Sequence, residues 1–282
     1  MVRLRVSSRH LILASPVFRK MLEGPWVESH ACHGRLREIS VGEWDLEAFI
    51  IVLDIIHGHH RLVPRSLRLA MLAKVAVIVD YYDCVEVVEV FWDYWLKGLK
   101  KDLPTSYGSE SLLVLLVSWV FSAVDIFEKM TELAVRHSKC LIKVADLPIP
   151  GEILDSIDQS RQISVSRTFS ALYTLLDSLT HEKAGYCFEC SSMLLGSLTI
   201  ESNKHEILSP RARAPFSGYS VTAVQTIVSK IRSPTWLLQR NYSSYCESYE
   251  SCDLSKQINP TIDTVDRGLR GLKLGDYQHR SK

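Results

Sequence analysis

The chain has 282 residues, which is long enough for two domains that each bury a core of their own. Hydrophobic residues make up 46% of it and charged residues 23%, a composition that excludes a disordered chain. Its 33 lysines and arginines nearly cancel its 32 aspartates and glutamates. No overall basic charge therefore supports binding to nucleic acid.

The sequence also limits where the protein is expected to reside. Its longest uncharged run, residues 111–124, is shorter than the roughly 20 apolar residues that span a bilayer, so no membrane partner is predicted. The first residues, MVRLRV, lack the apolar block of a signal peptide. Seven cysteines, an odd number, suit a reducing compartment. We therefore expect a cytoplasmic or nuclear protein.

The N-terminal segment predicts a strand followed by a pair of short helices. Residues 2–6 alternate apolar and basic side chains, which is typical of a strand with one buried face. The stretch 6–28 carries apolar residues at helical spacing and breaks at Ser15-Pro16, where serine can cap a helix that begins with proline. A Gly-Pro pair then ends that helix.

Three helices are predicted next, up to residue 99. Asp45 can cap the first, which ends before Gly58, and Ser66 can cap a second that is buried nearly all round. The third carries Trp92 and Trp95 at the spacing of a buried seam. The apolar face of the first, which we expect to lie on a sheet, comprises Leu46, Phe49, Ile50, Leu53 and Ile56.

A turn-rich segment at residues 101–110 predicts a domain boundary. It would separate an N-terminal domain at 1–100 from a helical domain at 111–240, and a partly flexible extension with one short helix would occupy 241–282. The helical domain is expected to hold helices at 111–122 and 125–138, a longer one through Val165 and Leu179, and another around Val224. No repeat of 20 to 50 residues occurs, which excludes a solenoid.

Several motifs of the N-terminal domain resemble the BTB/POZ family. Residues 13–22 read LASPVFRKML, which is similar to the family's string of Leu-Ala-Ser-Pro-Val-Phe, two variable residues and Met-Leu. Residues 44–58 read WDLEAFIIVLDIIHG and stand where the family has its "EAF" helix, and Asp80-Tyr81-Tyr82 matches the end of a later helix. The resemblance covers roughly residues 1 to 100 and is closest to BTB proteins of filamentous fungi.

The resemblance implies an α+β fold, a small BTB-like sheet covered by helices, followed by a mainly helical C-terminal domain. Residues 2–6 would be the family's second strand, so its first strand and a helix would be missing. Residues 36–41 stand where the family places a further strand. The implied function is protein–protein interaction, through a BTB homodimer or as a substrate adaptor of a cullin-type ubiquitin ligase. In the adaptors of this family, a hydrophobic residue, any residue and an acidic one contact the cullin. Trp26, Val27 and Glu28 occupy these positions here.

Cysteines in the C-terminal half suggest a candidate zinc site. Cys187 and Cys190 form a Cys-x-x-Cys pair, and Cys246 and Cys252 follow downstream. Zinc prefers four thiolate or imidazole ligands in a tetrahedron, and such a pair supplies two of them. The second pair has loose spacing, however, so ordinary reduced thiols and no cofactor are the main prediction. The alternative is a zinc-stabilised regulatory protein that contacts nucleic acid or chromatin through this half.

His57, His59 and His60 stand close together at the exit of a predicted helix. We interpret them as a solvated turn near the helix C-terminal dipole and not as a metal cluster. The nucleophile elbow, the phosphate-binding loop, the zinc-protease helix and the dinucleotide-binding turn are all missing from the sequence. The chain is therefore predicted to be an interaction protein and not an enzyme.

Overall fold

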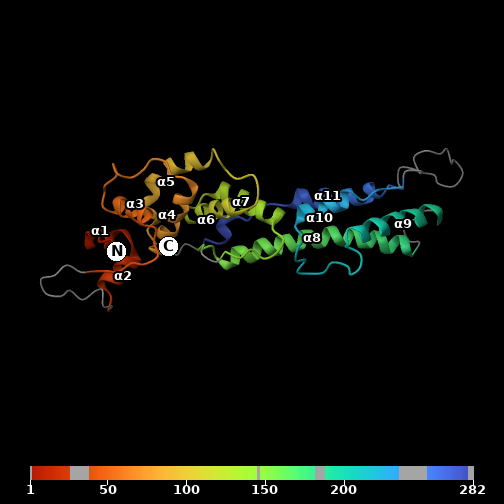
Figure 1. Ribbon diagram of the computed structural model, residues 1–282, viewed down its shortest axis with the longest axis horizontal. Helices are drawn as coiled ribbons and strands as arrows, with labels where there is room; N and C mark the ends of the chain where they lie inside the picture. The colour runs from red at the N-terminus through yellow and green to blue at the C-terminus, as the bar shows by residue number, and fades with distance from the viewer. Residues whose placement is uncertain (1, 26–37, 145–146, 182–187, 235–252, 279–282) are drawn as a thin grey trace. The chain divides into compact units, whose positions relative to one another are not determined.

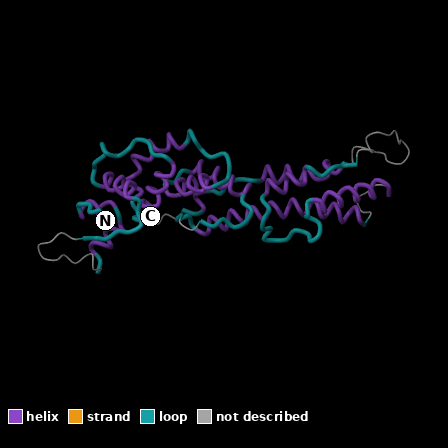
Figure 2. The backbone as a smooth tube through the Cα atoms, in the orientation of Figure 1, coloured by secondary structure: helices purple, strands orange, loops and turns teal. Residues whose placement is uncertain are grey.

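The computed structural model describes residues 2–25, 38–144, 147–181, 188–234 and 253–278. These residues form α-helices joined by turns and loops, and Figure 2 shows no strand among them. Within this described part, the sole β pairing is an isolated antiparallel bridge between Leu208 and Arg211. The observed architecture is all-α, and the predicted α+β class is wrong.

The predicted BTB-like sheet does not form in the described residues. Residues 2–6 and 38–41 have no strand conformation, although the two segments approach each other where Arg3 Nη2 lies 3.8 Å from Glu38 Oε1. Val2 and Leu4 remain exposed, so the alternation of apolar and basic side chains buries no face. A pair of strands without a third strand or a covering helix is only marginally stable, because it gains few hydrogen bonds and buries little apolar surface.

The chain divides into two compact units. The first comprises Met1–Thr131, Val144–Pro150 and Lys273–Lys282, and the second comprises Glu132–Lys143 and Gly151–Leu272. Helix α7 (Val124–His137) begins in the first unit and ends in the second.

The first unit is built from six helices that precede α7 and from a short C-terminal turn (Figure 1). Helix α4 packs against α3, α5 and α6, and α1 packs against α2 and α3. The turn-rich segment 101–108 joins α5 to α6 inside this unit. The helices are α1 (Ser8–Ala14), α2 (Pro16–Glu23), α3 (Leu46–Ile56), α4 (Leu69–Tyr81), α5 (Val85–Leu99) and α6 (Ser109–Val120), with the 3-10 turn η4 (Leu274–Asp276).

Several helix ends lie where local chemistry predicts them. Ser15 and Asp45 each accept a hydrogen bond from a backbone N–H in the first turn of their helix, and both predicted caps are confirmed. Gly58 follows α3 with φ +75°, a left-handed conformation that glycine adopts without strain. Ser66 does not cap α4, whose N-cap is Arg68 with no side-chain hydrogen bond.

The core of the first unit confirms the predicted aromatic seam. Trp95 is 1% exposed and donates its ring N–H to the carbonyl of Pro64 at 2.9 Å. Trp92 stacks on Phe121 with ring centroids 4.7 Å apart. The predicted apolar face of α3 is only partly correct, because Leu46 and Ile50 are exposed, whereas the three other members of that face are buried.

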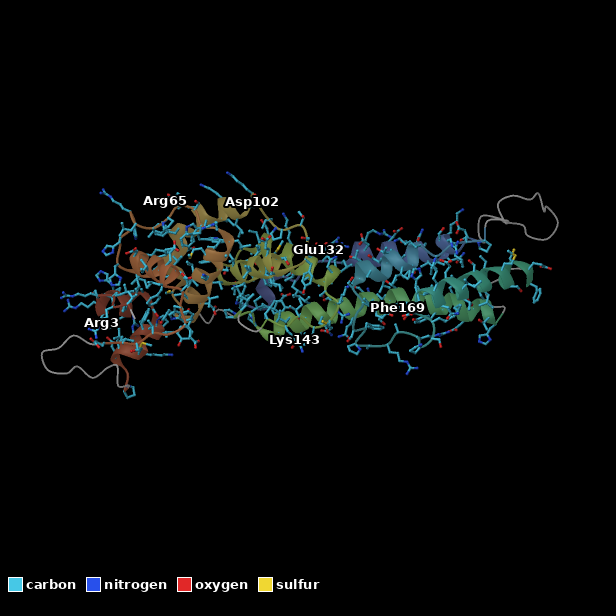
Figure 3. The ribbon with its side chains drawn as sticks, viewed as in Figure 1. Arg3, Arg65, Asp102, Glu132, Lys143 and Phe169 are labelled. Atoms are coloured by element: carbon cyan, nitrogen blue, oxygen red, sulfur yellow. The ribbon has the colours of Figure 1, made fainter. Side chains whose placement is uncertain are left out.

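The second unit is organised around α8 (Gly151–Thr180). Helices α9 (Phe188–Lys204), α10 (Val221–Ser229) and α11 (Leu254–Gly268) all pack against it, as Figure 1 shows. Phe169 lies on α8, where Figure 3 labels it, and is buried together with Val165 and Leu172. Helix α9 was not predicted, because Gly196 and several serines interrupt its apolar stripe of Cys190, Leu194 and Leu198.

Candidate functional site

The motifs that carry the family resemblance meet in the first unit. Ser15 accepts a hydrogen bond from Phe18 N–H at 3.0 Å and donates its hydroxyl to the backbone carbonyl of Tyr82. The ring of Phe18 stacks on that of Tyr82 with centroids 4.1 Å apart, and Trp44 donates its ring N–H to the Tyr82 hydroxyl at 3.2 Å. Burial raises the pKa of Tyr82. These residues therefore hold α2 against the end of α4, which is a structural role.

His57 connects the end of α3 to the start of α1. Ser7 N–H donates to His57 Nε2 at 2.9 Å, so the ring proton is on Nδ1, which donates to the carbonyl of Leu53 at 2.8 Å. His59 Nδ1 lies 3.1 Å from the carboxylate of Asp54, a partner that sequence reasoning missed. Among the described residues, no group of three or more His, Cys, Asp or Glu is placed to hold a metal ion.

Large apolar side chains are exposed in residues 2–13, which we call the N-terminal apolar segment. Leu13 on α1 is 81% exposed and Val2 is 61% exposed, and Leu4 and Val6 are exposed as well. Basic side chains alternate with them, and Figure 3 labels one, Arg3, at this end of the unit. A segment of this kind favours association with another protein surface, because exposed apolar area is lost from water on contact.

The residues predicted to contact a partner or a metal mostly fall outside the described part of the chain. Trp26, Val27 and Glu28 lie there, and so do Cys187, Cys246 and Cys252. Cys190 is described: it lies in the first turn of α9 and is buried with 5% exposure. The cullin contact and the zinc site therefore stay predictions from sequence.

A cavity of about 480 Å³ lies in the second unit, along one side of α8. We call it the α8 groove. Its α8 wall runs from Asp155 to Arg167, and Leu141, Ala214 and Phe216 complete the lining from two loops. The α8 wall also contributes amide, hydroxyl and aliphatic side chains, namely Gln159, Gln162, Ser166 and Ile163. This mixture of one apolar patch and several hydrogen-bonding groups suits recognition of a ligand.

A buried ion pair fixes the loop wall of the α8 groove. Arg161 is 0% exposed and donates two hydrogen bonds to Asp158 Oδ1, at 2.9 Å from Nε and 2.7 Å from Nη2. Its remaining donors bond to the carbonyls of Pro215, Phe216 and Tyr219 at 2.8 to 3.1 Å. A guanidinium that satisfies three backbone carbonyls holds the loop in a single arrangement.

Two further residues of α8 hold the same loop. The Tyr173 hydroxyl donates to the carbonyl of Ile207 at 2.6 Å and accepts from Ala212 N–H at 3.0 Å. Arg211 forms an ion pair with Asp177, and its guanidinium lies 4.9 Å from the centre of the Tyr173 ring. The hydrogen bond from Arg211 lowers the pKa of the Asp177 carboxyl. The loop 207–219 is therefore a preformed wall.

Sequence reasoning missed the α8 groove and the Asp158–Arg161 ion pair that fixes its loop wall. One signal was present. Asp158 and Arg161 occupy the same helical register as the buried Leu154 and Val165, and charged residues are almost never fully buried without a partner. An Asp and an Arg three residues apart on an apolar stripe therefore indicate a buried ion pair. No such signal indicated which loop it holds.

Comparisons with known protein families, with characterised proteins and with solved structures found no match for this chain. None of the helices in the described ranges is both long enough and apolar enough to cross a membrane.

Proposed function

We propose that this chain is a protein-interaction protein whose first unit associates with a second copy of itself and serves as an adaptor to a larger protein scaffold. The observation that carries the proposal is the N-terminal apolar segment, in which Leu13 is 81% exposed on the surface of α1. Neighbouring Val2, Leu4 and Val6 are exposed too. The balanced overall charge favours protein over nucleic acid as the partner.

The charges of this segment predict how self-association depends on salt. Arg3, Arg5 and Arg9 are exposed among the apolar side chains, so two copies that meet here bring like charges together. Added salt screens this repulsion, because the Debye length falls from about 10 Å at 0.1 M to about 3 Å at 1 M. We therefore expect association to strengthen with ionic strength.

Light scattering after size-exclusion chromatography tests self-association of the full chain. The Leu13→Glu variant should elute as a monomer at concentrations where the parent chain forms dimers. Leu62→Glu is the matched control, because Leu62 is 68% exposed in the turn after α3 and lies outside the N-terminal apolar segment. A parent chain that stays monomeric at high concentration and high salt would refute self-association, as would an equal effect of the two substitutions.

The adaptor role rests on Trp26, Val27 and Glu28 by resemblance. It is tested by capture of a purified cullin N-terminal domain on the immobilised full chain. A double variant, Trp26→Ala with Glu28→Ala, should lose capture, since tryptophan side chains supply much of the binding energy at protein interfaces. Unchanged capture by this variant would remove the proposed contact, and absence of capture by the parent chain would remove the cullin.

A further inference from the structure

The α8 groove is separate from the N-terminal apolar segment, because it lies in the second unit and that segment lies in the first. Along the α8 wall, an acidic side chain lies at one end of the groove and a basic side chain lies at the other. Asp155 lies in the second turn of α8 and Arg167 lies just past the middle of the helix, and both are exposed. Asp158 lies between them, but its charge is balanced by Arg161. Among the described residues no ion pair involves Asp155 or Arg167, so the groove offers a negative charge at one end and a positive charge at the other.

The length of the groove decides the class of ligand. Asp155 and Arg167 are twelve residues apart on one helix, which corresponds to about 18 Å at 1.5 Å per residue. A small metabolite cannot reach two groups so far apart. An extended peptide rises about 3.3 Å per residue, so roughly six residues cover this distance.

The middle of the groove suits the centre of such a peptide. Ile163 is 45% exposed and faces the cavity together with Leu141 and Phe216, which provides an apolar patch for one side chain of the peptide. Gln159 and Gln162 line the same wall, and side-chain amides both donate and accept hydrogen bonds as a peptide backbone requires. Gln162 donates one N–H to Asp158 and keeps its second N–H and its oxygen for a ligand. Because Arg161 already holds the loop wall in place, peptide binding loses little conformational entropy from the loop.

We propose that the α8 groove binds a short extended peptide from a partner protein, with a basic residue at the Asp155 end, an apolar residue at Ile163 and an acidic residue at the Arg167 end. The proposal goes beyond self-association of the first unit and does not depend on it. A full chain that stays monomeric would leave peptide binding in place.

The experiment is fluorescence anisotropy of the full chain with labelled, end-capped peptides of six residues. The peptides carry lysine and glutamate at the two termini and leucine near the centre, in both chain directions. Asp155→Lys should weaken binding of the better peptide about tenfold, because an exposed ion pair is replaced by like charges. A peptide with glutamate in place of that lysine should then bind Asp155→Lys better than it binds the parent chain.

Matched controls keep the result specific. Glu152→Lys makes the same change one turn earlier on α8, at an exposed residue that does not line the groove, and should leave binding within about twofold. Ile163→Ser should weaken binding of every peptide irrespective of charge. Circular dichroism checks that each variant keeps its helices. Failure of both peptides to bind, equal effects of Asp155→Lys and Glu152→Lys, or no recovery with the charge-exchanged peptide would each overturn the proposal.

Discussion

Replacing Arg161 with methionine should release the loop 207–219 from α8. Arg161 makes five hydrogen bonds, two to Asp158 and three to backbone carbonyls of the loop. Its removal leaves the Asp158 carboxylate in a site where that side chain is 12% exposed, with the amide of Gln162 as its remaining partner at 2.6 Å. Loss of one member of a buried ion pair costs about 3–5 kcal/mol.

Hydrogen exchange followed by mass spectrometry measures this cost at the loop itself. Gly218 N–H donates to the carbonyl of Lys139 at 2.8 Å and Ala212 N–H donates to Tyr173, so both amides report on loop opening. A loss of about 3 kcal/mol makes their exchange faster by roughly two orders of magnitude, since 1.4 kcal/mol is tenfold. Arg161→Lys should give a smaller effect, because lysine keeps the charge and three donors.

A double variant separates the charge from the loop contacts. Asp158→Asn together with Arg161→Met removes the uncompensated buried charge, so it should exchange more slowly than Arg161→Met alone. The reasoning is refuted if Arg161→Met speeds exchange of the Ala212 and Gly218 amides by less than tenfold. The reasoning is also refuted if the loop amides of the double variant exchange as fast as those of Arg161→Met.

Two further predictions concern polar contacts within each unit. His57→Ala removes the acceptor of Ser7 N–H and should lower the free energy of unfolding by about 1 kcal/mol, measured by urea titration, whereas the exposed His59→Ala should change it less. The pKa of Asp177 lies below its usual value of 3.8 because Arg211 donates a hydrogen bond to its carboxylate. The stabilisation of the loop by this ion pair is therefore complete above pH about 4 and is lost as pH falls through the lowered pKa. At pH 5, amides of the loop 207–213 should therefore exchange faster in Asp177→Asn than in the parent chain. At pH 3 or below, the difference between the two exchange rates should shrink. A difference that grows on acidification would contradict the assignment.

Local chemistry was sufficient to predict several helix ends of the first unit. Ser15 before Pro16 and Asp45 before Leu46 cap helices because their side chains reach the first free N–H groups, which requires only neighbouring residues. The predicted burial of Trp92 and Trp95 also followed from helical spacing alone.

The prediction of a sheet failed because a strand depends on distant residues. The alternation of residues 2–6 is compatible with a strand, yet it forms one only if another segment pairs with it and covers one face. In the structure the side chains of Arg3 and Glu38 approach each other, but the two segments form no strand, and Val2 is exposed to solvent. The motifs at 13–22 and 80–82 indicated a sheet-containing fold by resemblance, whereas their contacts through Ser15, Phe18 and Tyr82 join helices.

By itself the sequence determined where most of the helices form, which side chains cap them and that no strong net charge directs the chain to nucleic acid, because these depend on spacing and composition. Only the tertiary structure decided that Arg161 and Asp158 are buried together, that a loop some 55 residues away closes on them, and that Asp155, Ile163 and Arg167 line one groove with Phe216. Such contacts join segments far apart in the chain, and packing in three dimensions selects which segments meet.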